Sequence, residues 1–160
     1  MLPSRAIQND CRPFLFEDIL MKVTLERKNT EYLLEAKGAS GIPVMIDNKG
    51  SEVVQGSSPM ELILMGVGGC SAIDIISILK KQRQEITSYK VEVTGDRVEQ
   101  DGSKPFKAIE VIVHLEGDIT PEKAQRAADL SFQKYCSVSK TFDSVVDITY
   151  QVSLNGKLIS

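Results

Sequence analysis

The chain has 160 residues, of which 42% are hydrophobic and 26% are charged, and its formal net charge is −3. This length and composition favour one soluble globular domain that can bury a core of its own. The acidic balance argues against nucleic acid or an anionic membrane surface as the main partner.

Residues 1–20 are predicted to be an N-terminal extension, and residues 21–160 a single domain. The extension lacks the basic and apolar regions of a signal peptide. Met21 opens a clean strand pattern and could be the natural start, in which case Cys11 carries no chemistry. The chain is then expected to be cytoplasmic, with its other thiols reduced at rest.

Three short strands are predicted before the longest apolar segment. They cover residues 21–28, 31–37 and 42–47, and the turn residues between them indicate an N-terminal three-stranded meander. A long helix is predicted to follow, over residues 59–83. Ser58 suits its N-cap, Pro59 its first position, and Glu61 stands where a capping box needs it.

The apolar run 62–79 inside this helix is about as long as a membrane span. Asp74 would be costly in hydrocarbon, so the sequence favours a central helix buried on all sides in a soluble protein. Glycine inside a helix costs roughly 1 kcal/mol relative to alanine. Gly66, Gly68 and Gly69 therefore predict close packing of another helix or a partner subunit.

The second half of the chain predicts a hairpin, two helices and a last strand. The hairpin strands are 88–98 and 106–116, joined through Asp101-Gly102. Helix 121–135 follows, with a predicted inner stripe of small side chains; then come a short helix over 137–144 and a terminal strand over 145–154. The stripe comprises Ala124, Ala127 or Ala128, Ser131 and Tyr135. The fold class is α+β.

Cys70 and Cys136 are the candidate reactive residues. Cys70 lies too deep in its helix for the helix N-terminus to stabilise a thiolate, and an ionised Asp74 on the same face would raise its pKa. Cys136 precedes the short helix and is flanked by Lys134 and Lys140, which favours a thiolate. Free cysteines are often plain core residues, and spacing does not tell whether these two meet.

Other catalytic and metal chemistry has little support in the sequence. There is no CxxC motif and only one histidine, so no structural metal site is expected. His114 lies in an alternating run and is predicted to be an ordinary half-buried strand residue. The chain has three cysteines, and this small, odd number does not suit a secreted disulfide scaffold.

Two motifs resemble those of the OsmC/Ohr family, the osmotically inducible protein C and organic hydroperoxide resistance proteins. Pro59 opens the long helix and Cys70 stands eleven residues later, as in that family. The segment Cys136-Ser137-Val138-Ser139-Lys140 resembles the second family motif. The resemblance runs from about Met21 to Val152 and places the chain in a less characterised OsmC-like branch.

The resemblance implies an intertwined homodimer with two long helices buried between curved sheets. It also implies reduction of organic hydroperoxides, a peroxiredoxin activity used in stress response, without a bound cofactor. In this reading Cys70 is the peroxidatic thiol and Cys136 the resolving thiol, and an external dithiol reduces their disulfide. The alternative is a non-catalytic dimer that binds a small apolar ligand or senses oxidants.

The resemblance also exposes two departures from the hydroperoxide-resistance branch. Met60 stands where that branch has the glutamate of an Arg–Glu network, and Glu61 is expected to serve the capping box. Lys28-Asn29-Thr30 stands where that branch has its arginine. Arg27 and Arg97 are the possible substitutes for that arginine.

Overall fold

The computed structural model describes residues 20–159, and Cys11 and all but the last residue of the predicted extension lie outside this range. The described chain divides after Ser58 into two compact parts. Each part is described by itself. The division into an extension and a domain from residue 21 stays a prediction.

The first part contains one antiparallel sheet in the order β1-β2-β3, which confirms the predicted meander. Its strands are β1 (Thr24–Arg27), β2 (Leu34–Lys37) and β3 (Pro43–Ile46). The chain then forms a loop around the buried carboxylate of Asp47. This carboxylate accepts hydrogen bonds from the N–H groups of Asn48 and Gln55 and from the Ser51 hydroxyl, at 2.7, 3.0 and 2.9 Å.

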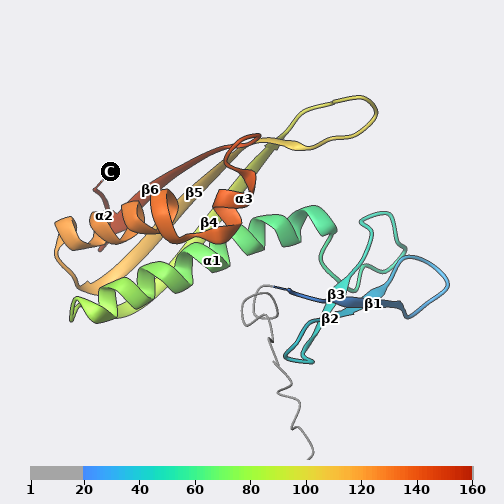
Figure 1. Ribbon diagram of the computed structural model, residues 1–160, viewed down its shortest axis with the longest axis horizontal. Coiled ribbons are helices and arrows are strands. Elements are labelled where there is room, and N and C mark those ends of the chain that lie inside the picture. Colours follow the sequence, from blue (N-terminus) through green and yellow to red (C-terminus); the bar gives the residue numbers. More distant parts are fainter. Residues whose placement is uncertain (1–19, 160) are drawn as a thin grey trace, which may run out of the picture. The chain divides into compact units, whose positions relative to one another are not determined.

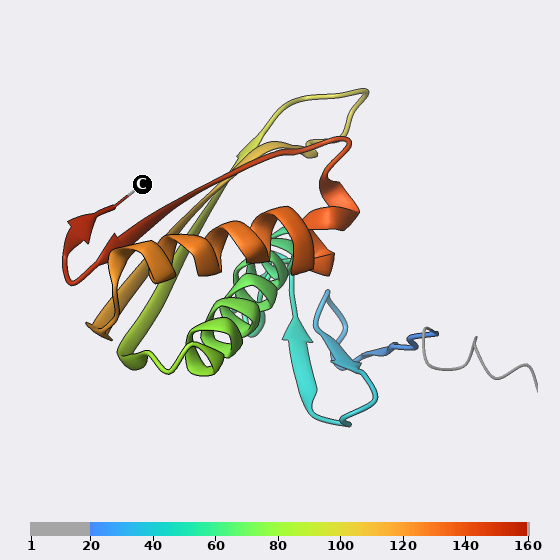
Figure 2. The ribbon, with the colours of Figure 1, turned by 60° about the vertical axis from the view of Figure 1, so that its left-hand side comes forward.

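The second part has a four-stranded sheet with helices on one face (Figure 1, Figure 2). The strand order is β4-β5-β6-β7, and only the β5–β6 pair is parallel. The chain makes that parallel crossover through α2, the π-helical turn η1 and α3. In chain order the elements are α1 (Pro59–Lys81), β4 (Glu85–Arg97), β5 (Phe106–Asp118), α2 (Pro121–Leu130), η1 (Ser131–Tyr135), α3 (Ser137–Phe142), β6 (Asp147–Leu154) and β7 (Lys157–Leu158).

Alternating side chains of the sheet form the core beneath the helices. The predicted inward residues of β5 are all buried, and those of β4 pack against the same cluster. From α1 the core takes Val67, Ile75 and Leu79. The predicted hairpin and its inward faces are confirmed; the inward residues are Tyr89, Val91, Val93, Ile109, Val111, Val113 and Leu115.

Helix α1 is buried on one side only within a single chain. Its buried residues fall on the side that faces the sheet, while Met65 and Ile73 are 56% and 70% exposed. The prediction of burial on all sides is therefore wrong for one chain, because the sheet and crossover cover only one side of the helix. By length and composition α1 could also cross a membrane, a test that core helices of soluble proteins pass as well.

The glycines of α1 differ in what lies beside them within the chain, and packing of a partner subunit against them stays a prediction. A Cβ on Gly68 would lie 2.9 Å from Val93 Cγ2, so this glycine lets strand β4 approach the helix. A Cβ on Gly66 would make an ordinary contact with Val138 at 3.7 Å, and one on Gly69 meets nothing within 4 Å. A strand, rather than another helix, explains Gly68.

The π-helical turn η1 shifts the register at the end of α2. Its Cys136 N–H donates to the carbonyl of Ser131 at 2.8 Å, five residues back. The wider turn breaks the 3.6-residue period. Ser131 is buried as predicted, together with the alanines of the stripe, but Tyr135 is 48% exposed. Phe132 takes its place and stacks on Tyr150, with ring centroids 4.4 Å apart.

The last strand of the described chain is β7 and not the predicted strand ending at 154. Asn155 and Gly156 have φ values of 49° and 78°, which suit a two-residue hairpin turn between β6 and β7. Asn-Gly is the strongest short hairpin signal, so the sequence itself indicated a turn and a further strand after residue 154.

Candidate active site

Cys70 projects from the middle of α1 and is half-buried. Asp74 follows one helical turn later, so the thiol and the carboxylate share a helix face. This pairing follows from the i, i+4 spacing alone. The side of α1 that carries them is packed against η1 and α3.

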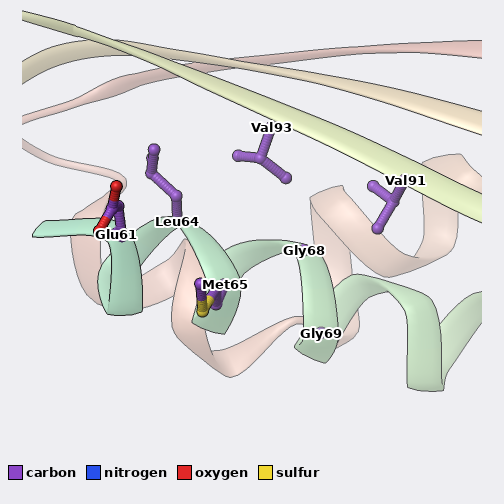
Figure 3. Close-up of a pocket in the computed structure, with 7 residues that line it drawn as sticks. All are labelled: Glu61, Leu64, Met65, Gly68, Gly69, Val91 and Val93. Carbon is purple, nitrogen blue, oxygen red and sulfur yellow. The ribbon is translucent and has the colours of Figure 1, made fainter. Parts of the chain in front are cut away.

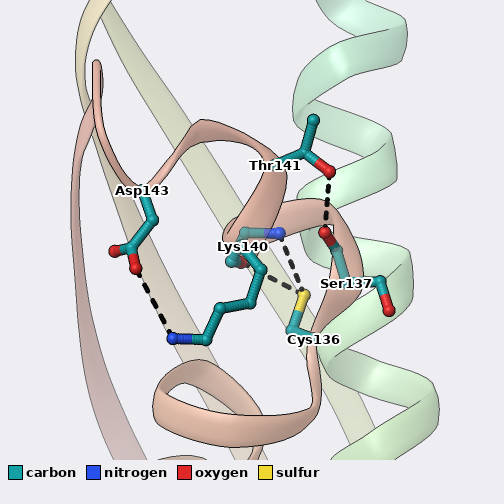
Figure 4. A network of polar contacts seen from close by, with 6 residues as sticks. Cys136, Ser137, Lys140, Thr141 and Asp143 are labelled. Atoms are coloured by element: carbon teal, nitrogen blue, oxygen red, sulfur yellow. Dashed lines mark hydrogen bonds and ion pairs between the residues drawn. The ribbon is translucent and has the colours of Figure 1, made fainter.

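Cys136 lies at the junction of η1 and α3 and is fully buried. Its sulfur caps α3 by accepting hydrogen bonds from Ser139, from the backbone N–H at 3.4 Å and from the hydroxyl at 3.1 Å (Figure 4). The sulfur therefore occupies the position that an N-cap oxygen normally takes.

The crossover brings the two thiols together. Cys70 Sγ, a carboxylate oxygen of Asp74 and Cys136 Sγ all lie within 4.8 Å of one another. Both cysteines are free. Asp74 Oδ2 also accepts a hydrogen bond from the Ser131 hydroxyl at 3.3 Å. The candidate pair that spacing left unconnected is thus one compact cluster.

The surroundings of Cys136 do not favour the thiolate that its neighbours in the sequence predict. Burial raises the pKa of the Cys136 thiol above its ordinary value, the Ser139 hydrogen bonds oppose that rise, and Cys70 adds to it. The N-cap position is confirmed, but burial outweighs its effect. The flanking lysines are engaged elsewhere, since Lys140 pairs with Asp143 at 3.5 Å (Figure 4). Lys134 lies over the ring of Tyr135.

Met60, at the family's glutamate position, and Arg97, a possible substitute for the family's arginine, have other surroundings here. Met60 packs against the core and lines an apolar hollow with Phe106 and Phe142. Arg97 Nε donates to the carbonyl of Lys104 at 2.6 Å and so ties the β4–β5 hairpin together. Met60 therefore offers no charge to an activating network. The capping-box role of Glu61 stays a prediction.

His114 is a strand residue, as predicted, and its side chain is 37% exposed. Its Nε2 lies 3.7 Å from a carboxylate oxygen of Glu92 on the neighbouring strand β4. It is absent from the cysteine cluster. The site thus has no histidine within it, and its chemistry rests on sulfur and carboxylate.

A groove of about 400 Å³ runs between α1 and β4 (Figure 3). Its walls are mostly apolar, with Glu61 as the charged member and neither cysteine among its lining residues. The lining residues are Glu61, Leu64, Met65, Gly68, Gly69, Val91 and Val93.

Sequence reasoning missed two serines of the site. Ser139 stands three residues after the capping sulfur, the spacing at which a side chain reaches back in a capping box, so a local signal existed. Ser131 gave no such signal as a ligand of Asp74, because the two residues are 57 positions apart. Only the packing of η1 on α1 connects them.

The chain is similar to proteins of a known family. A family model described as OsmC-like protein matches residues 49–151. Protein YhfA of Escherichia coli (strain K12) is 38% identical over 115 residues, which are 71% of this chain and 84% of YhfA. The chain belongs to the OsmC-like family. The resemblance seen in its two motifs is confirmed.

Solved structures of the OsmC/Ohr family share the fold. A hypothetical protein from Aquifex aeolicus VF5 is 30% identical, with a TM-score of 0.73 over 85% of this chain and 98% of that one. The organic hydroperoxide resistance protein OhrB of Bacillus subtilis is 20% identical, with a TM-score of 0.62 over 85% of this chain and 99% of OhrB.

Proposed function

We propose that this OsmC-like protein reduces organic hydroperoxides through Cys70 and Cys136. The observation that carries the proposal is the cluster of two free thiols within 4.8 Å of one another. The fold is shared with a protein named for organic hydroperoxide resistance, which points to the same substrate class.

The different exposure of the two thiols supports an order of reaction for them. Cys70 is half-buried, whereas Cys136 is 0% exposed, so Cys70 takes the role of the thiol that meets the peroxide first. The Cys70 thiolate attacks one oxygen of the peroxide, an S–O bond forms, and the O–O bond breaks. The leaving alkoxide takes a proton and becomes an alcohol, and Cys70 becomes a sulfenic acid.

The second step closes a disulfide, and the proton of the Cys136 thiol leaves with the hydroxyl of the sulfenic acid as water. The Cys136 sulfur attacks the Cys70 sulfur, a disulfide forms, and the hydroxyl of the sulfenic acid leaves as water. An external dithiol then supplies two electrons, reduces the disulfide to two thiols and is itself oxidised to a disulfide. Reduced thiols at rest suit a cytoplasmic location, which is part of the proposal.

Peroxide consumption tests the assignment. Wild-type protein given tert-butyl hydroperoxide and a dithiol is expected to consume the peroxide, and Cys70→Ser is expected to reduce the rate to background. Cys11→Ser is the matched control and is expected to keep the wild-type rate. Equal background consumption by wild type and Cys70→Ser would remove the catalytic role.

A homodimer is the proposed assembly, as the family resemblance implies. The exposed stripe of α1 includes Met65 and Ile73, and a second copy of the chain would bury them. Sedimentation of the wild type is expected to give a dimer, and Ile73→Lys a monomer. Thr94→Lys, at an exposed position of β4, is the control and is expected to stay dimeric. A monomeric wild type would contradict the proposal.

The groove between α1 and β4 favours one further candidate, a protein that binds a small apolar ligand there. In that case a fluorescent apolar probe would bind Cys70→Ser as tightly as wild type, and neither would consume peroxide. Rapid peroxide turnover that depends on Cys70 would rule out a purely binding role.

A further inference from the structure

The Cys70–Asp74–Cys136 cluster has the composition of a metal site as well as of a redox pair. Two sulfurs and a carboxylate oxygen lie within 4.8 Å of one another. Thiolates and carboxylates are ligands of Zn²⁺, and three protein ligands leave the fourth tetrahedral position open. We propose that the reduced protein binds one Zn²⁺ ion per chain at this cluster, with solvent as the fourth ligand.

The spacing of the three atoms is close to what the ion needs. With Zn–S bonds of about 2.3 Å and Zn–O bonds of about 2.1 Å, tetrahedral ligands stand about 3.5–3.8 Å apart. The cluster must therefore contract by no more than about 1.3 Å. Cys70 and Asp74 come from one turn of α1, so these two ligands lie on the same face of one helix.

Hydrogen bonds around the cluster already orient two of the three ligands. Ser139 donates to Cys136 Sγ from its N–H and its hydroxyl, and the Ser131 hydroxyl donates to Asp74 Oδ2 at 3.3 Å. Metal ligands in proteins are characteristically held by such outer hydrogen bonds. Cys70 is half-buried, which leaves an entry path for the ion, while Cys136 is sealed in the interior.

Zn²⁺ binding displaces the two thiol protons and occupies the lone pairs that attack a peroxide or close a disulfide. The bound ion and the Cys70–Cys136 disulfide are therefore mutually exclusive. Binding does not depend on hydroperoxide reduction, since it uses only the ligands and their positions. A chain without peroxidase activity would still bind the ion.

The test measures Zn²⁺ binding by the reduced full chain carrying Cys11→Ser, in the absence of peroxide and in competition with a chromophoric chelator. One ion per chain is expected. Asp74→Asn is expected to weaken binding more than tenfold, and Ser139→Ala about tenfold, as for an outer partner of a ligand. His114→Gln is the control, because His114 and Glu92 form a separate surface pair, and it is expected to leave affinity unchanged.

Cadmium supplies a second readout that does not depend on affinity. Cd²⁺ bound to thiolates gives an ultraviolet charge-transfer band whose intensity counts the sulfurs. The parent is expected to show two thiolates per ion, and Cys70→Ser or Cys136→Ser one. Circular dichroism shows whether each variant is folded. Unchanged Zn²⁺ affinity in both folded cysteine variants, or loss of binding in His114→Gln, would overturn the proposal.

Discussion

The two parts of the chain are stabilised in different ways. Every member of the main buried apolar cluster lies between residues 59 and 159. The first part instead exposes apolar side chains on its sheet, among them Leu25 and Val44, and is tied together by polar contacts around Asp47. The part with a core of its own is the part that holds the two thiols at a fixed spacing.

Truncation of one apolar residue in each part gives the largest expected contrast. Ile75 is fully buried, so Ile75→Ala should lower the free energy of unfolding by about 2–5 kcal/mol. Val44 is 46% exposed, and Val44→Ala should change the free energy of unfolding by about 0.5 kcal/mol. Urea unfolding measures both. Equal losses would mean that the two parts do not differ as described.

Two glycines of α1 provide a finer contrast within the second part. Gly68→Ala forces a Cβ to within 2.9 Å of Val93, and overpacking against a stiff side chain costs about 1–3 kcal/mol. The gain in helix propensity, about 1 kcal/mol, offsets part of this cost. Gly66→Ala makes only an ordinary contact and keeps that gain. Thermal unfolding should show a lower Tm for Gly68→Ala and a higher one for Gly66→Ala.

Features that depend on neighbouring residues were predicted from the sequence, and features that depend on long-range contacts were not. Elements with strong local signals were predicted correctly: the meander, the long helix from Pro59, the hairpin and the short helix after Cys136. The neighbour of Gly68 was not, because a glycine shows that something approaches closely and does not show what. The exposure of Tyr135 was missed because a π-helical turn has no clear local pattern.

The site was predicted in part. The family motifs named Cys70 and Cys136, and helical spacing placed Asp74 beside Cys70. Local sequence also suggested a thiolate at Cys136, whereas burial raises the pKa of this thiol. Burial depends on the packing of the crossover against α1, which no short segment encodes. The spatial meeting of the two sulfurs is likewise a tertiary property.

Removal of the Ser139 hydroxyl sharpens the account of Cys136. Ser139→Ala deletes the 3.1 Å hydrogen bond to the sulfur, and a hydrogen bond of this kind contributes about 0.5–1.5 kcal/mol. Disulfide closure after oxidation of Cys70 should slow by about two- to tenfold, as followed by rapid-quench thiol alkylation. Ser137 is exposed, and the Ser137→Ala variant should close its disulfide at the wild-type rate. If Ser139→Ala closed the disulfide at the wild-type rate, the Ser139 hydroxyl would have no role in the reactivity of Cys136.

The smallest expected effect is a pH dependence in the first part. Hydrogen bonds from the Gln55 N–H, then from Asn48 and Ser51, hold the pKa of Asp47 below its ordinary value. A depressed folded-state pKa stabilises the fold above the unfolded-state pKa, and this contribution is lost as pH falls through the folded-state pKa. Asp47→Asn should therefore be less stable than wild type at neutral pH. The difference should disappear in acid.

Urea unfolding across that pH range measures this difference. Glu31→Gln, an exposed carboxylate between β1 and β2, is the control and should match wild type throughout. A constant difference between Asp47→Asn and wild type at all pH values would show that the charge of Asp47 is not its cause.

The central claim is that Cys70 and Cys136 form one redox pair, and peptide mapping tests it most directly. Reduced Cys11→Ser protein is treated with one equivalent of an organic hydroperoxide, alkylated, digested and analysed by mass spectrometry. The account predicts a disulfide that joins the peptides of Cys70 and Cys136 within one chain. Oxidation that leaves both thiols free, or that links chains through Cys70 alone, would contradict it.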